Sequence, residues 1–176
     1  MFNLLIGLEK PTSGEIQVLG QHINQVSKSE FYKYRRQIGV VFQDYKIIRD
    51  CTVRQNLSLP LNLLGWDETK IQKEVERLAE NVGLDAYLDE YPAHLSGGEQ
   101  QRIAIGRALI HRPKIIFADE PTGNLDQETS RKIFSLFEVA KQNGAMVLVV
   151  THDPLLPAKY GNSTFHLKHG ELSESA

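Results

Sequence analysis

The sequence is poor in cysteine and in net charge. A single cysteine, Cys51, occurs among 176 residues, so no internal disulfide can form, which fits a reducing, cytosolic compartment. Lys and Arg number 20 against 22 Asp and Glu, which leaves a formal net charge of −2. No sequence-wide basic field therefore points to a nucleic acid partner.

Long apolar runs are also missing. The longest, Ala145–Val150, is far shorter than the about 20 apolar residues that a membrane-spanning helix needs. The segment Met1–Leu8 has neither the basic region nor the longer apolar stretch of a signal peptide. We therefore expect a soluble chain that reaches a membrane only by docking onto another protein.

A third absence concerns phosphate binding. Many nucleotide-binding proteins hold phosphates with a loop of the form G-x-x-x-x-G-K-[S/T], whose backbone N–H groups and lysine grip the anion. No Gly-Lys dipeptide occurs anywhere in the chain. These residues therefore do not contain that loop.

What the sequence does have is an alternation of short apolar strands with amphipathic helices. The segments that are apolar on both faces, as buried strands are, are Ile38–Phe42, Lys114–Ala118 and Ala145–Val150. The expected helices are Ile71–Val82, Ser96–Ile110 and Ile133–Ala140. The alternation predicts one α/β domain, with a mostly parallel sheet covered by helices on both faces.

Other segments carry weaker patterns. We expect Phe2–Leu8 to be the end of a helix, Glu15–Leu19 a half-buried strand, and Thr164–Leu172 a hairpin that turns at His169. Asp44–Leu64 has a mixed pattern that predicts no single element.

Polar residues follow directly after each apolar strand: Gln43, Asp119, Glu120 and His152. Ligands of parallel α/β sheets bind at the carboxyl ends of the strands, so these residues predict a single site. One of the two acids can hold Mg²⁺ while the next polarises an attacking water. An amide can bind Mg²⁺ without adding charge, and a histidine can bond a terminal phosphate oxygen. Solvated acids at a strand end, a surface glutamine and a structural histidine are the alternatives.

The string Leu95-Ser96-Gly97-Gly98-Glu99-Gln100-Gln101-Arg102 opens the second helix. Ser96 and Glu99 have the spacing of a capping box. That box alone does not explain the paired glycines, which are poor helix formers. Glycines at a helix start let the backbone approach a ligand, and the free N–H groups favour an anion there. A tight turn then follows the two acids, with Asp126 as the N-cap of the next helix.

These motifs resemble those of the nucleotide-binding subunits of ABC transporters. The matching segments, in the family's order, are Gln43 (Q-loop), Leu95–Gln100 (signature), Ile115–Glu120 (Walker B), Gly123–Asp126 (D-loop) and His152 (switch histidine). The resemblance implies a P-loop NTPase-like three-layer core with an added α-helical lobe. The helical lobe would span approximately residues 44–112 of a single partial domain, 1–176, and residues 1–43 and 113–176 would form the RecA-like core.

The resemblance also implies a role for each residue. Asp119 would coordinate Mg²⁺, with Gln43 sensing the ion, and Glu120 would act as base or orient the water. His152 would contact the γ-phosphate of ATP. The residues that would bind ATP held by the other protomer of a dimer are Ser96, Gly97, Gly98 and Gln100, and Asp126 would lie at the dimer contact.

A narrower resemblance is to the bacterial cell-division branch of the family, the FtsE type. It rests on Arg35–Tyr45, Glu120–Asp126 and Phe165–Leu172. Subunits for lipoprotein release and macrolide-type export share the sequence motif at Glu120–Asp126, so they remain an alternative. The implied partner is an integral membrane subunit, FtsX-like or a permease, and the implied location is the cytoplasmic face of the plasma membrane.

In the family, the P-loop (Walker A) precedes a segment similar to Phe2–Gly14. We therefore expect an N-terminally truncated subunit that by itself neither binds ATP tightly nor hydrolyses it. It could still complete a site whose P-loop comes from an intact protomer. A genuine P-loop-less, non-catalytic interaction protein is the alternative. A soluble ABC ATPase acting on DNA or ribosomes is disfavoured, because the chain has no long insertions and no basic surplus.

Overall fold

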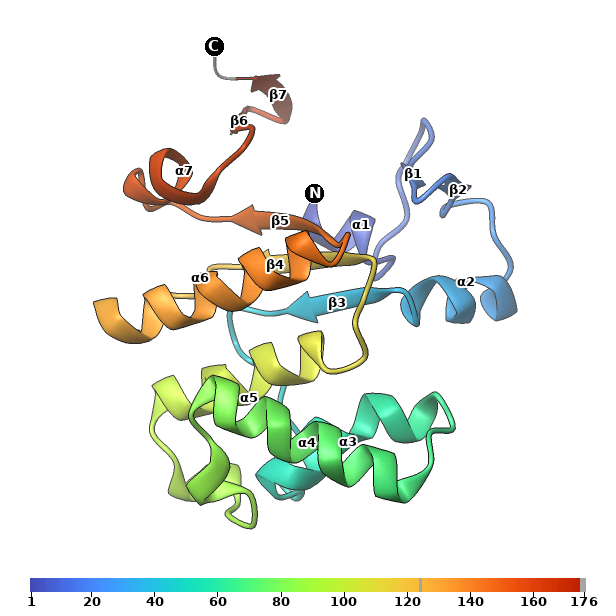
Figure 1. Ribbon diagram of the computed structural model, residues 1–176. Coiled ribbons are helices and arrows are strands. Elements are labelled where there is room, and N and C mark those ends of the chain that lie inside the picture. The colour runs from blue at the N-terminus through green and yellow to red at the C-terminus, as the bar shows by residue number, and fades with distance from the viewer. Residues whose placement is uncertain (124, 175–176) are drawn as a thin grey trace.

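The computed structural model describes residues 1–123 and 125–174, and its centre is a parallel sheet (Figure 1). Its strands are β3 (Ile38–Val41), β4 (Ile115–Asp119) and β5 (Met146–Val150), in the order β3-β4-β5. Val41 lies beside Ala118, and Asp119 lies beside Val150. The carboxyl ends of all three strands therefore meet at one edge of the sheet. The predicted parallel α/β fold is confirmed.

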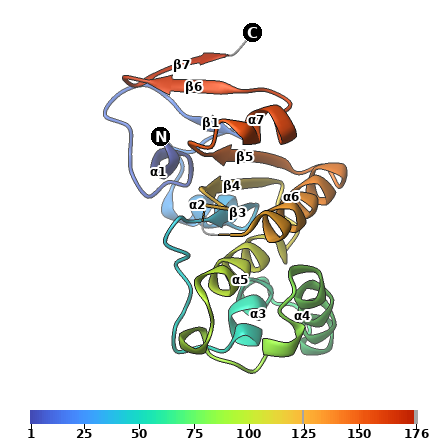
Figure 2. The ribbon, with the colours of Figure 1, turned by 90° about the vertical axis from the view of Figure 1, so that its left-hand side faces the viewer.

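Side chains of β4 alternate between two hydrophobic clusters, one on each face of the sheet. Ile116 and Ala118 pack with α5 (Gly97–Leu109) and α6 (Gln127–Gln142). Ile115 and Phe117 pack on the other face with α1 (Phe2–Leu5) and α2 (Lys28–Arg35). Because successive side chains of a strand point to opposite faces, an all-apolar strand needs helices on both sides. The result is a three-layer core (Figure 2).

A group of helices lies below the sheet in the view of Figure 1. It is formed by α3 (Val53–Leu63), α4 (Glu68–Val82) and α5, together with the short 3₁₀ helices Asp85–Tyr87 and Pro92–His94. The first two helices and α5 share a core that includes Val53, Leu57, Leu61, Ile71, Val75, Leu78, Val82 and Ile103. Helix α5 packs on this core and also on the sheet, through Ile105 and Ala108. The predicted division at residues 44 and 112 stays a prediction.

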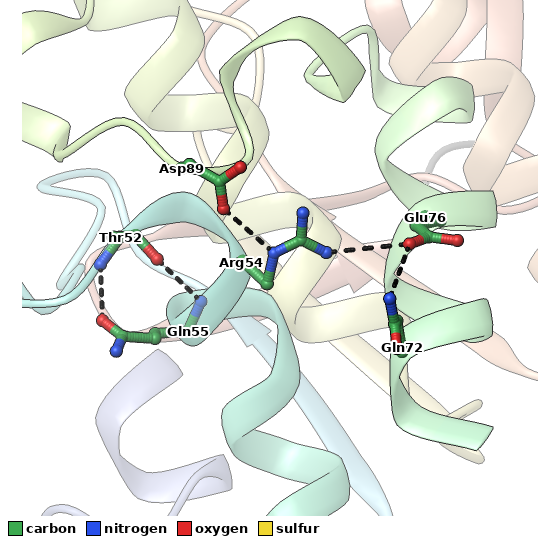
Figure 3. A network of polar contacts seen from close by, with 6 residues as sticks. All are labelled: Thr52, Arg54, Gln55, Gln72, Glu76 and Asp89. Carbon is green, nitrogen blue, oxygen red and sulfur yellow. Dashed lines mark hydrogen bonds and ion pairs between the residues drawn. The ribbon is translucent and has the colours of Figure 1, made fainter. Parts of the chain in front are cut away.

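Polar contacts fix the start of α3 (Figure 3). Thr52 caps the helix by accepting a hydrogen bond from the Gln55 amide, and Gln55 reaches back to the Thr52 amide at 2.9 Å. Arg54 bonds Asp89 at 3.1 Å and lies 3.9 Å from Glu76 on α4. These contacts tie α3 to α4 and to the loop that leads to α5.

Several elements differ from the expectation. The mixed segment Asp44–Leu64 contains α3, whose pattern Pro60 interrupts. Helix α2 was not expected, because its apolar pattern is weak: among its described side chains only Tyr34 is fully buried, and Phe31 is half-buried. Helix α1 stops at Leu5. Glu15–Leu19 yields a two-residue strand, β1 (Gln17–Val18), which pairs with β2 (Gln21–His22).

After β5 the chain forms α7 (Leu155–Tyr160) and the expected hairpin, β6 (Phe165–Lys168) and β7 (Glu171–Glu174). The hairpin turns at His169 and Gly170, both with positive φ. Across residues 1–123 and 125–174, no helix is both long enough and apolar enough to cross a membrane.

Candidate functional site

The two acids stand where β4 ends. Asp119 is the last residue of the strand, and the Glu120 amide continues the ladder by donating to the Val150 carbonyl at 2.9 Å. Glu120 then turns the chain with a φ of +46°, in the left-handed region that non-glycine residues seldom occupy. Its backbone is therefore fixed by β5 on one side and by a tight turn on the other.

Both carboxylate oxygens of Glu120 have donors from the loop after β5. The His152 amide donates to Oε1 at 2.7 Å, and the His152 Nδ1 lies 3.0 Å from the same oxygen. The Thr151 hydroxyl donates to Oε2 at 3.1 Å. The Glu120 side chain is 11% exposed, whereas the His152 side chain is 86% exposed. Glu120 and His152, which follow neighbouring strands of the sheet, are thus in direct contact.

The pKa of Asp119 is raised above its ordinary value. Burial is the main cause, the negative charge of Glu120 adds to it, and the charge of His152 opposes it. A carboxylate placed beside a second carboxylate in a partly buried position is stabilised by a bound cation. This electrostatic arrangement fits a Mg²⁺ ligand.

Gln43 follows β3 at the same edge of the sheet. Because Val41 pairs with Ala118, Gln43 and Asp119 both lie just beyond paired positions of neighbouring strands, and the Gln43 side chain is exposed. The described residues contain no group of three or more His, Cys, Asp or Glu that could cage a metal. Mg²⁺ commonly uses one or two carboxylates with waters and phosphate oxygens, so one acid and one amide suit it.

The start of α5 is a complete capping box. Ser96 is the N-cap and accepts from the Glu99 amide, and the Glu99 carboxylate accepts from the Ser96 amide at 2.8 Å and the Ser96 hydroxyl at 2.7 Å. These hydrogen bonds, first of all the one from the hydroxyl, lower the pKa of Glu99. The Ser96 hydroxyl is therefore engaged internally, and a ligand that bonds it must compete with Glu99.

The glycines and the next glutamine of this string have different surroundings. Gly97 is exposed, whereas a Cβ on Gly98 would lie 3.2 Å from the Leu125 side chain. The side-chain Nε2 of Gln100 donates to the backbone carbonyls of Pro92 and Leu95, each at 3.0 Å. Gln100 thus supports the turn before α5 in this structure, and its predicted contact with ATP stays a prediction.

Gln101 is a residue of the site that the sequence did not indicate. It is fully buried, and its Nε2 donates to the Glu120 carbonyl at 3.2 Å and to the Pro121 carbonyl. Among the described residues its Oε1 has no partner. The sequence signal that could have predicted its burial is its position on the same face of α5 as the buried Ala104 and Ala108. Thr151 likewise carries no sequence signal beyond its place directly after β5.

Asp126 caps α6, as predicted. It accepts from the Thr129 amide at 2.9 Å and from the Thr129 hydroxyl at 2.6 Å, and these bonds lower its pKa. Asn124, within the predicted D-loop, lies outside the described residues. The dimer contact predicted for Asp126 stays a prediction.

Solved structures with this arrangement are ATP-binding cassettes. The chain is 35% identical to MJ0796, titled a bacterial ABC transporter cassette, in its dimeric structure, with a TM-score of 0.90 over 98% of this chain and 78% of that one. A second dimeric structure of MJ0796, in a post-hydrolysis state with ADP and Pi, matches with a TM-score of 0.89. The fold class is therefore that of a cassette ATPase.

The sequence profile described as "ABC transporter" matches residues 1–123, so the chain belongs to the ABC transporter family as an ATP-binding subunit. It is 40% identical to the uncharacterised ABC transporter ATP-binding protein MJ1508 of Methanocaldococcus jannaschii, over 99% of this chain and 78% of that protein. It resembles the cell division ATP-binding protein FtsE of Mycobacterium tuberculosis (44% identity, 85% of this chain, 65% of that protein) and of Escherichia coli (38%, 98% and 78%). The chain thus spans 65 to 78% of the length of these relatives.

Proposed function

We propose that the protein is the ATP-hydrolysing subunit of an ABC-type membrane complex, of the cell-division kind. The observation that supports this most is the geometry around Glu120: a carboxylate held beside an exposed histidine, directly after an acid suited to Mg²⁺. The same chain presents Ser96 and two glycines at a capped helix start.

In this mechanism each residue acts on one part of the reaction. Mg²⁺, bound by Asp119 and Gln43, would neutralise charge on the phosphates. Glu120 orients and polarises the attacking water. The exposed imidazole of His152 can donate to a phosphate oxygen. The helix start at Ser96–Gly98 offers N–H groups to the phosphate of ATP held by a second protomer, in a homodimer or with an intact partner.

The cell-division assignment rests on similarity to the FtsE proteins. The proposed partner is an integral membrane subunit, FtsX-like or a permease, and the proposed location is the cytoplasmic face of the membrane. A subunit of another transporter is the second candidate, since the methionine import protein MetN 3 of Bacillus cereus is 36% identical over 99% of this chain. Subunits for lipoprotein release and macrolide-type export belong to the same alternative.

The residues 1–176 contain no Gly-Lys dipeptide and so no P-loop. We propose that they carry the Walker B and signature parts of the site but do not by themselves hydrolyse ATP. A non-catalytic interaction protein is the competing function of another class.

The deciding experiment compares the 176-residue chain with the product of the complete coding sequence, each purified with any membrane protein that accompanies it. Mg²⁺-dependent release of phosphate from ATP by the complete product, together with a co-purifying integral membrane subunit, supports the proposal. If the complete product neither binds nor hydrolyses ATP, the non-catalytic alternative holds. Rapid hydrolysis by residues 1–176 alone would contradict the role given to the P-loop.

A further inference from the structure

The contacts that hold the Glu120 carboxylate differ in how easily they can be broken. The His152 imidazole is 86% exposed, and an ion pair in water contributes little and is easily exchanged. The Thr151 hydroxyl belongs to a half-buried side chain, and the Glu120 side chain is 11% exposed. A hydrogen bond to a charged group in such surroundings is stronger than one in water.

Thr151 is itself fixed in place. Its Oγ1 accepts from the Asp153 amide at 3.0 Å while its hydroxyl proton points to Glu120 Oε2 at 3.1 Å. The hydroxyl cannot turn away without breaking one of these two bonds. Threonine also has few side-chain conformations, because two heavy atoms share its Cβ.

Two contact points define the plane of a carboxylate. The His152 amide fixes Oε1, and the Thr151 hydroxyl fixes Oε2, so the plane persists when the imidazole moves away. Without the hydroxyl, only Oε1 is held, and the carboxylate can twist about the Cγ–Cδ bond of Glu120. The direction of the lone pairs that face a water depends on this plane.

We propose that Thr151 is a positioning residue for Glu120. It holds the carboxylate in the orientation needed to polarise water while the His152 imidazole leaves to contact the phosphate. The inference rests on the proposed ATPase function, and it adds a residue that acts through Glu120 without touching the nucleotide.

Two variants separate the hydroxyl from the shape of the side chain. Thr151→Val keeps the branched shape and removes the hydroxyl, whereas Thr151→Ser keeps the hydroxyl. In the complete gene product we expect Thr151→Val to lower kcat about 10-fold with KM within twofold of the wild type, and Thr151→Ser to recover most of the rate. Thr164→Val, at another half-buried threonine ahead of β6, is the matched control and should leave both constants unchanged.

A second measurement does not depend on activity. In the 176-residue chain labelled with ¹³C-glutamate, the Glu120 carboxylate resonance, assigned with Glu120→Gln, should move in Thr151→Val and return in Thr151→Ser. Thr151→Ala replaces the valine variant if the latter does not fold. An unmoved resonance, a wild-type kcat in Thr151→Val, or an equal loss in the serine variant would overturn the inference. If the wild type does not hydrolyse ATP, the proposed function fails, and the resonance alone decides the role of Thr151.

Discussion

The buried side-chain amide of Gln101 donates to the backbone carbonyl of Glu120 at 3.2 Å, across 19 residues of sequence. This bond joins the helix that Ser96 caps to the turn that carries Glu120, the proposed catalytic base. In the proposed dimer, Ser96 serves the ATP of one protomer and Glu120 serves that of the other. Gln101 therefore makes a direct hydrogen bond between α5, which Ser96 caps, and the turn that carries Glu120.

Replacing Gln101 by Met should destabilise the chain and slow hydrolysis. The buried Pro121 carbonyl loses its side-chain donor, and the Glu120 carbonyl keeps only the Gly123 amide at 3.4 Å. This loss costs about 1–3 kcal/mol, and the removal of the unpartnered Oε1 offsets part of it. We expect a net loss of about 1–2 kcal/mol in urea denaturation and a kcat lowered several-fold in the complete gene product. Gln72→Met, on the exposed face of α4, is the control, and an equal loss in both variants would remove the special role of Gln101.

In the complete gene product, Glu120→Gln should abolish ATP hydrolysis while leaving ATP binding intact. The amide keeps the shape of the side chain but cannot accept the proton of the attacking water, so we expect kcat to fall at least about 100-fold. Steady-state phosphate release and equilibrium binding of a labelled nucleotide measure the two effects. Glu128→Gln, which changes an exposed side chain of α6, should keep the wild-type rate. Residual activity above a tenth of the wild type would show that another group is the base.

Ser96→Ala should weaken α5 and the half-site that α5 offers to a partner. Loss of the capping hydroxyl costs about 0.5–2 kcal/mol. The functional measurement mixes the 176-residue chain with an intact P-loop-bearing protomer whose own Ser-Gly-Gly is disabled. The wild-type chain should restore hydrolysis, and Ser96→Ala should restore much less. Ser135→Ala, on the exposed side of α6, should behave as the wild type, and no restoration by any chain would refute the half-site.

The stability of the fold should fall on mild acidification because of His111. Burial lowers the pKa of this imidazole, and the nearby backbone carbonyls, first that of Ile38, only partly oppose that effect. Its Nε2 donates to the Ile38 carbonyl at 3.0 Å, and among the described residues its Nδ1 has no partner. The folded chain therefore favours neutral His111.

The unfolded chain binds the proton more readily, since its histidine titrates near pH 6.5. The stability contributed by neutral His111 is complete above that pH and is lost as the pH falls through the lower folded-state pKa. Urea denaturation between pH 8 and pH 5 should show this decline in the wild type and a smaller one in His111→Gln. The exposed His166→Gln should retain the wild-type decline. Parallel curves for wild type and His111→Gln would contradict the prediction.

The sequence by itself determined the three buried strands, the polar residues at their ends and the caps at Ser96 and Asp126. These features depend on local chemistry: an apolar run of strand length, and a side-chain oxygen three residues before the amide that it accepts from. The parallel order of the strands follows from the alternation with helices. Family membership also came from the motifs, because their order along the chain is visible without coordinates.

Tertiary structure alone decided what surrounds Glu120. Thr151 lies 31 residues away and Gln101 lies 19 away, and no periodic pattern connects them to the acid. The φ of +46° at Glu120 is likewise imposed by the packing around it and not by a glycine. Helix α3 was not predicted, because Pro60 and the polar residues of the segment interrupt its apolar periodicity. Its apolar side chains pack against α4 and α5 in the folded chain. Contacts between distant residues carry no local sequence pattern, so the orientation of the Glu120 carboxylate is decided by the tertiary fold.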